Sequence, residues 1–215
     1  MSGRCSTVRD IELSGFARTT QRPRLYAALH FGSPVLAYIG LRQQVEKSLL
    51  VIARELGDKN PMPGAKQQFA TRKVAWVEKA AGAPFLGTSE SDVLRARDHL
   101  LGGNSVYAAV DVPGNVVRRA EWMRVGGAEM LLATGILKLA AITGCDLQLA
   151  LGFHRNGRIV VHGGPVVYGS TTVALGAQVM SCLQDVINRW PEEWWMWPFF
   201  VDRVQEGRDA ATRYN

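Results

Sequence analysis

Short apolar runs alternate with segments of helical periodicity along most of the chain. The runs that have the length and flanking residues of buried strands cover residues 25–29, 48–53, 84–86, 105–110 and 120–125. The helices expected from the spacing of apolar positions cover residues 34–45, 66–81, 89–101, 129–143 and 172–188. Strands and helices of these lengths in alternation predict an α/β fold, with a mostly parallel central sheet flanked by helices.

One later stretch predicts antiparallel pairing instead. Residues 146–153 and 158–161 flank the dipeptide Asn156-Gly157, which is a strong β-hairpin signal. We therefore expect an antiparallel hairpin at one edge of the sheet. No repeat or linker divides the sequence, so we expect a single domain over residues 1–215, in which residues 1–21 could form a flexible N-terminal segment.

Composition is that of a globular protein, with 47% hydrophobic and 20% charged residues. The three cysteines are far apart and form no C-x-x-C pair, so neither a disulfide framework nor a zinc site is indicated. The N-terminal region has no apolar signal core, and Lys138 and Asp146 interrupt the longest apolar region. We expect a cytoplasmic protein, either free or peripheral at the inner face of the membrane.

The net charge of +6 favours anionic partners, among them phospholipid surfaces, phosphate-bearing donors and acidic carrier proteins. Basic residues are spread over several elements and form no stripe interleaved with aromatics, so we expect no nucleic-acid binding. The sequence contains no phosphate-binding glycine loop, dinucleotide fingerprint, nucleophile elbow or H-E-x-x-H motif. No cofactor and no metal are therefore expected.

The candidate chemistry begins at His30, which follows the apolar run at residues 25–29 directly. Ser33 and Pro34 have the residue types of a helix N-cap and first helical position. A helix N-terminus with free backbone N–H groups is thus expected beside the imidazole. Such a pair suits proton abstraction by the imidazole while charge on a carbonyl oxygen is stabilised. The alternative interpretation is a packed, hydrogen-bonded histidine.

Polar residues follow two further predicted strands. Arg54 and Glu55 end one, and Asp111 ends another. The carboxyl ends of parallel strands share one edge of a sheet, so a base, a cation and carboxylates are expected there together. Strand ends are also polar simply because they meet solvent, and that interpretation stays open.

Residues 190–200 contain four of the six tryptophans. This density fits an aromatic cover over a pocket, a segment in a membrane interface, or a cap on the hydrophobic core.

Taken in order, several motifs resemble the bacterial lipid A biosynthesis (lauroyl/myristoyl) acyltransferase family, which includes phosphatidylinositol mannoside acyltransferases. The similarity covers residues 24–200 and is specific in the order and spacing of its pieces. The matching pieces are His30-Phe31-Gly32, residues 51–54 with Asn60-Pro61, Arg72 with Gly82, residues 101–103 with Asp111, residues 134–144, and residues 188–197.

The resemblance implies an enzyme that transfers an acyl group from an acyl carrier protein or coenzyme A thioester to a hydroxyl or amine acceptor. It makes His30 the general base. The implied substrate-binding residues are Phe31, Gly32, Ser33, Arg54, Asn60 and Arg72, with Arg54 or Arg72 binding a phosphate.

The chain departs from the family at the acid of the H-x-x-x-x-D/E motif, because Val35 stands at that position. Either Asp111 or Glu55 replaces the acid, or the acceptor is a better nucleophile than an alcohol, or the protein is a noncatalytic acyl- or carrier-binding partner of another enzyme. Only 29 residues precede His30, where the family has a longer N-terminal part with a membrane anchor. Elements that would wall the acyl site are then either missing or supplied by a partner chain.

Overall fold

The computed structural model describes residues 11–16, 22–45, 48–53, 64–112, 120–125, 128–156 and 158–196. The strands are β1 (Ile11–Ser14), β2 (Arg24–Gly32), β3 (Leu50–Ile52), β4 (Phe85–Leu86), β5 (Val106–Ala109), β6 (Ala120–Val125), β7 (Ala128–Ala133), β8 (Asp146–Arg155) and β9 (Arg158–Val167). The helices are α1 (Pro34–Gln44), α2 (Ala65–Ala81), α3 (Glu90–Leu101), α4 (Gly135–Thr143) and α5 (Thr172–Arg189), followed by a 3₁₀ turn at Pro191–Glu193.

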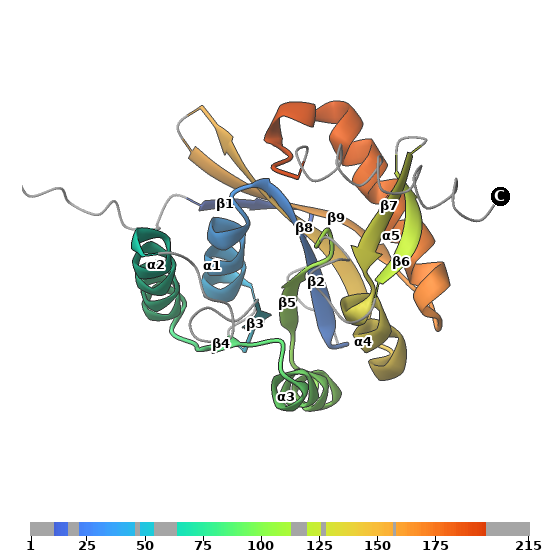
Figure 1. Cartoon of the computed structure of the whole chain (residues 1–215), viewed down its shortest axis with the longest axis horizontal. Helices are drawn as coiled ribbons and strands as arrows, with labels where there is room; N and C mark the ends of the chain where they lie inside the picture. The colour runs from blue at the N-terminus through green and yellow to red at the C-terminus, as the bar shows by residue number, and fades with distance from the viewer. Residues whose placement is uncertain are drawn as a thin grey trace, which may run out of the picture.

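Seven strands form one sheet in the order β1-β9-β8-β2-β5-β3-β4 (Figure 1). Strands β8, β2, β5, β3 and β4 run parallel to one another, whereas β9 is antiparallel to β8. The predicted α/β class with a mostly parallel sheet is confirmed, as is the antiparallel hairpin, which β8 and β9 form. The short strand β1, which the sequence analysis did not predict, adds to β9 in parallel, so that β1 and β4 are the two edge strands.

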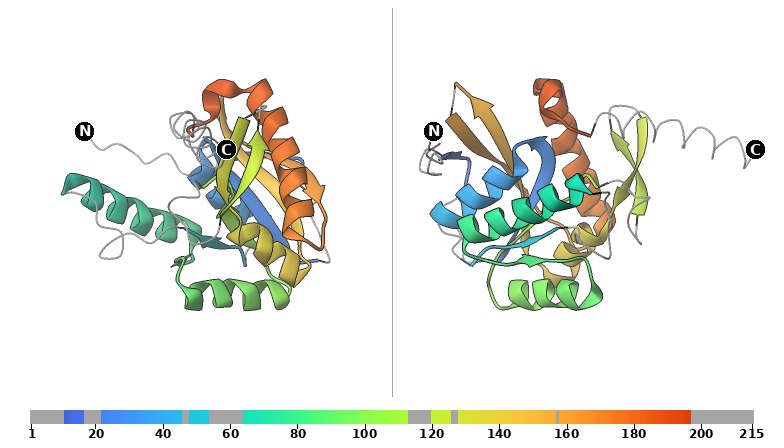
Figure 2. Two further views of the ribbon diagram at one scale, coloured as in Figure 1. Left: turned by 45° about the vertical axis from the view of Figure 1, so that its right-hand side comes forward. Right: turned by 60° about the vertical axis from the view of Figure 1, so that its left-hand side comes forward.

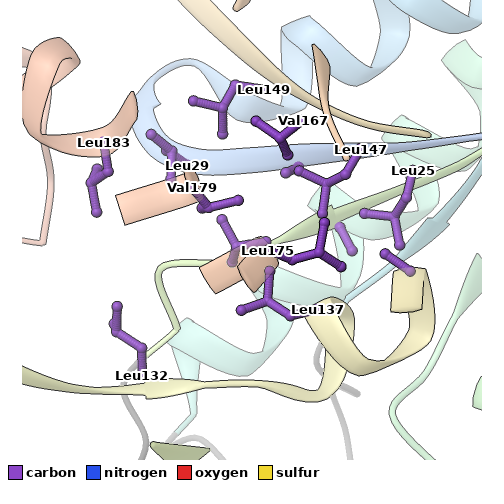
Figure 3. Packing of buried hydrophobic residues seen from close by; sticks show 14 of the residues in the cluster. Leu25, Leu29, Leu132, Leu137, Leu147, Leu149, Val167, Leu175, Val179 and Leu183 are labelled. Atoms are coloured by element: carbon purple, nitrogen blue, oxygen red, sulfur yellow. The ribbon is translucent and has the colours of Figure 1, made fainter. Parts of the chain in front are cut away.

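Helices cover both faces of the sheet, and the alternation along β2 shows which face is which. Leu25, Ala27 and Leu29 pack into the larger apolar cluster, beneath α3, α4 and α5 (Figure 3). Tyr26 and Ala28 belong to the second cluster, beneath α1 and α2. Figure 2 shows α2 on the outer side of α1, projecting from the body of the protein. Because β2 is buried on both faces, its sequence is almost continuously apolar.

The helix expected over residues 129–143 is wrong in its first part. Ala128–Ala133 is strand β7, which pairs antiparallel with β6 in a separate two-stranded sheet, and α4 begins only at Gly135. A short apolar run has the same appearance in a strand and in a buried helix, so periodicity alone could not separate them. The low helix propensity of Gly135 marks the boundary between the two elements.

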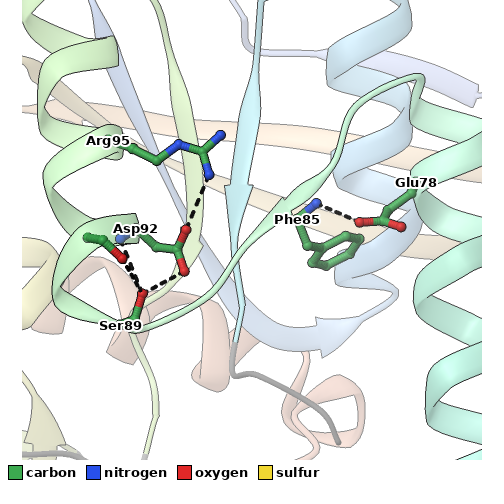
Figure 4. A network of polar contacts seen from close by, with 6 residues as sticks. Glu78, Phe85, Ser89, Asp92 and Arg95 are labelled. Carbon is green, nitrogen blue, oxygen red and sulfur yellow. Dashed lines mark hydrogen bonds and ion pairs between the residues drawn. The ribbon is translucent and has the colours of Figure 1, made fainter.

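Helix α3 begins at the N-cap residue Ser89 (Figure 4). The Ser89 hydroxyl accepts a hydrogen bond from the backbone N–H of Asp92 and donates to its carboxylate.

None of the helices in the described ranges is long and apolar enough to cross a membrane.

Strand β2 ends at Gly32, where the chain turns toward α1 and its backbone lies close to that of Gly152. Gly32 has φ +50°, and a Cβ atom there would lie 2.0 Å from the carbonyl oxygen of Gly152 on β8. The register between β2 and β8 shifts between Ala28 and Gly32, so this contact lies at a bulge. Only glycine fits, because a side chain would meet both backbone strain and a steric clash.

We therefore expect Gly32→Ala to lower the free energy of unfolding by about 2–4 kcal/mol, the sum of left-handed backbone strain and overpacking. Urea denaturation followed by circular dichroism measures the change. The matched control is Gly135→Ala, where a Cβ atom would meet open space and φ lies outside the left-handed region. Equal midpoints for the two variants would contradict the steric argument.

Candidate functional site

His30 and Asp111 meet at the carboxyl ends of two neighbouring parallel strands. Ala28 of β2 is in register with Ala109 of β5, and the next backbone bond runs from the N–H of Val110 to the carbonyl of Ala28 over 2.9 Å. The chain after β5 thus stays beside β2 and brings Asp111 next to His30. The Nδ1 atom of His30 lies 2.8 Å from Oδ1 of Asp111, and the backbone N–H of His30 donates to Oδ2 over 2.8 Å.

The Asp111 carboxylate is fully buried, with 0% exposure, and is held by three N–H groups. The third donor is the indole Nε1–H of Trp194, which lies 3.0 Å from Oδ2. A buried carboxylate is tolerated when its oxygens accept hydrogen bonds from several donors. The three donors therefore fix the orientation of the carboxylate.

The His30 ring has one nitrogen turned to the acid and retains access to solvent. Its side chain is 37% exposed, in contrast to the buried Asp111. Because the carboxylate accepts at Nδ1, the neutral ring carries its proton there and leaves the lone pair on Nε2. This tautomer is the one a general base requires.

The pKa of His30 reflects opposing influences. Burial of the ring lowers its pKa, but the hydrogen bond and the negative charge of Asp111 together outweigh burial. The positive charge of Lys73 on α2 acts against protonation as well. The net result is a pKa raised above the ordinary value of 6.5 for histidine.

The tryptophan-rich segment closes over the ends of β2 and β8. The backbone N–H of Trp195 donates to the carbonyl of His30 over 2.8 Å, and Trp194 bridges to Phe31 in antiparallel fashion. Trp194 is 2% exposed and belongs to the core, whereas Trp195 is 58% exposed. Of the three interpretations of this segment, the core cap therefore applies to Trp194, and Trp195 remains at the surface.

An ion pair holds this segment to the β8–β9 hairpin. The guanidinium of Arg155 on β8 pairs with the carboxylate of Glu193. The same guanidinium lies 4.9 Å above the ring centroid of Phe153 and 6.0 Å from that of Trp190. The ring centroids of Phe153 and Trp190 are 4.8 Å apart. The ion pair and the cation–π contacts of Arg155 thus hold the turn that places Trp194 beside Asp111.

Of the residues expected at the site, His30 and Asp111 are brought together. Phe31 is buried against Phe153 on the α5 side of the sheet, so its ring supports the site from beneath. Arg54, Glu55 and Asn60 lie outside the described residues. Arg72 is exposed on α2, and no described contact joins it to the His30–Asp111 pair.

The helix N-terminus differs from the expectation in one respect. Ser33 is the N-cap of α1 and Pro34 is its first residue, as predicted, but the Ser33 side chain makes no capping bond. The Ser33 N–H donates to the carbonyl of Gly152 over 2.8 Å, so it is not free to bind an oxyanion. Pro34 has no N–H, and the donors left in the first turn are those of Val35 and Leu36.

Sequence reasoning missed two residues that build the site. Trp194 was visible only as one member of a tryptophan cluster, and nothing local distinguishes it from its neighbours. Tyr107 of β5 donates its hydroxyl to the carbonyl of Pro34 over 2.7 Å and so anchors the start of α1. Burial, reinforced by the charge of Asp111, raises the pKa of Tyr107 so that the hydroxyl stays protonated.

Within the described ranges no group of three or more histidine, cysteine or carboxylate side chains could hold a metal ion. Comparison of the sequence with protein-family models and with curated proteins found no match.

We expect Asp111→Asn to lower the pKa of His30. The amide removes the negative charge that raises this pKa, while burial and Lys73 continue to lower it. Titration of the imidazole C–H signals by NMR measures the shift, with His30→Ala used to assign the signal. The signals of His154, which is exposed, serve as an internal reference in both proteins. An unchanged His30 titration would contradict the coupling to Asp111.

Trp194→Phe keeps an aromatic ring but removes the indole donor to Oδ2 of Asp111. Because the remaining donors then neutralise the carboxylate less, the pKa of His30 should rise further. The free energy of unfolding should fall by about 1.5–3 kcal/mol, the usual contribution of a hydrogen bond to a charged group. NMR titration and urea denaturation test the two effects, and the exposed Trp195→Phe is the matched control. A pKa that falls or stays constant in Trp194→Phe would show that the indole does not tune the pair.

Proposed function

We propose that this protein is an acyltransferase, which moves an acyl group from an acyl carrier protein or coenzyme A thioester to a hydroxyl or amine acceptor. The observation that carries the proposal is the hydrogen bond of 2.8 Å between Nδ1 of His30 and the buried Asp111, which leaves Nε2 of a partly exposed ring as the base. The motifs that resemble lipid A acyltransferases supply the substrate class.

In the proposed reaction, Nε2 of His30 takes the proton of the acceptor as its oxygen or nitrogen attacks the thioester carbonyl carbon. The C–S bond of the tetrahedral intermediate then breaks, and the departing sulfur receives the proton from the imidazolium. Asp111 stabilises the imidazolium and holds the ring in place in both steps. The N–H groups of Val35 and Leu36 are the candidates for stabilising the oxyanion.

In this proposal, Asp111 takes the role of the motif acid that Val35 replaces. A histidine without an orienting acid would favour the noncatalytic partner, but here a carboxylate from the neighbouring strand reaches Nδ1. Binding of a donor phosphate by Arg54 or Arg72 remains part of the proposal, as do a cytoplasmic location and a partner chain that completes the acyl site.

Thiol release from a panel of acyl carrier protein and coenzyme A thioesters, offered with hydroxyl and amine acceptors, tests the proposal. His30→Ala should lower turnover by about 10³-fold or more, and Asp111→Asn by about 10³–10⁴-fold, as loss of an orienting acid does elsewhere. The matched control is His154→Ala, an exposed histidine on β8. Donor binding with no thiol release in the wild type would favour the noncatalytic partner.

The pH profile follows from the raised pKa of His30. A general base must be unprotonated, so turnover should fall as the pH drops through this raised pKa, and the acid limb should begin above 6.5. In Asp111→Asn the acid limb of the residual activity should move to lower pH. An acid limb that is identical in the two proteins would assign the titrating group elsewhere.

A further inference from the structure

Helix α2 carries an aromatic ridge that nothing in the described chain covers. Phe69 is 70% exposed and Trp76 is 41% exposed. They are seven residues apart, which places them two turns apart on the same side of a helix. The buried positions of α2 are Val77 and Ala81 near its C-terminal end, so no residue in its first three turns is buried. Figure 2 shows this helix projecting outward from the body of the protein.

Basic side chains flank the ridge on both sides. At 100° per residue, Lys66 and Lys73 lie on one side of the aromatic pair, and Arg72 and Lys79 lie on the other. None of these four cations forms an ion pair with a carboxylate among the described residues.

The acidic residue of α2 is turned away from this face. Glu78 accepts a hydrogen bond of 2.9 Å from the backbone N–H of Phe85, at the side of the helix that faces the protein (Figure 4). The outer face therefore combines exposed aromatic rings with positive charges that no carboxylate of the described residues pairs with.

We propose that α2 docks on the surface of an anionic phospholipid bilayer, with Phe69 and Trp76 inserted at the headgroup level. Aromatic side chains on one face with lysine and arginine beside them define a helix that lies in the membrane interface. The two aromatic rings project from a helix surface, and cations lie on both sides of them. Such a face fits the flat, deformable and anionic surface of a lipid bilayer. Each lysine or arginine near such a surface adds electrostatic attraction.

The docking deepens the proposed function and rests on it for its consequence. Helices α1 and α2 cover the same face of the sheet, and the charge of Lys73 reaches His30. A protein docked through α2 would thus have its candidate base on the side next to the bilayer. The acceptor or product that this implies is amphiphilic and lies at the membrane surface.

Co-sedimentation of the full chain with vesicles tests the docking. Wild-type protein should bind vesicles of phosphatidylglycerol and phosphatidylcholine at least tenfold more tightly than vesicles of phosphatidylcholine alone, and salt should weaken this binding. Two double variants, Phe69→Ser with Trp76→Ser and Lys66→Glu with Lys79→Glu, should each lose about tenfold or more in affinity.

The matched control combines Leu101→Ser on α3, which is 62% exposed, with Lys138→Glu on α4, and it should bind like the wild type. Circular dichroism and urea denaturation confirm that each variant is folded. Equal binding to the two vesicle types, or wild-type affinity in both α2 variants, would overturn the proposal. It would also be overturned if the serine variant lost affinity for an acyl carrier protein but not for vesicles.

His30→Ala separates the docking from the chemistry. This variant should bind anionic vesicles like the wild type although it does not release thiol. Vesicle binding without turnover in the wild type supports the docking and counts against the acyltransferase. Turnover without any vesicle preference overturns the docking and leaves the acyltransferase standing.

Discussion

The buried carboxylate of Asp111 is the constraint on which the rest of the site depends. Removing a charged group from water is costly unless donors replace the water, and the three donors here come from two segments far apart in the sequence. Two are the backbone N–H and ring Nδ1 of His30, and the third is the indole of Trp194. One side chain thus couples the ends of β2 and β5 to the turn that follows α5.

That coupling makes the C-terminal segment part of the candidate site. The turn at Pro191–Glu193 is positioned by the stacked and ion-paired Arg155, and it delivers the backbone of Trp195 to the carbonyl of His30. The backbone on both sides of His30 is therefore engaged, because its N–H donates to Asp111 and its carbonyl accepts from the N–H of Trp195. A histidine in this setting has little freedom to reorient, which is what a positioned base requires.

The sequence predicted the sheet, most of the helices and the meeting of His30 with Asp111, because the apolar runs define parallel strands and such strands end at one edge. It did not predict β7, because a short and largely apolar run suits a strand and a helix equally. It did not identify Trp194, because that role depends on a contact across 83 residues. It predicted free N–H groups at the start of α1 but not the hydrogen bond that occupies the Ser33 N–H, because that bond depends on the distant Gly152.

The placement of the acid just after β5 changes what the start of α1 can do. With an acid at position 35, the first turn of α1 would have to hold a charge beside His30. Val35 instead packs against the cluster beneath α1 and α2, and Asp111 is supplied by the segment that follows β5 rather than by a helix end. Because β2 and β5 are joined by backbone hydrogen bonds, the distance between the base and the acid is set by the sheet itself. Burial and Lys73 then restrain a pKa that Asp111 raises, so the base keeps a usable unprotonated population while its imidazolium remains stabilised.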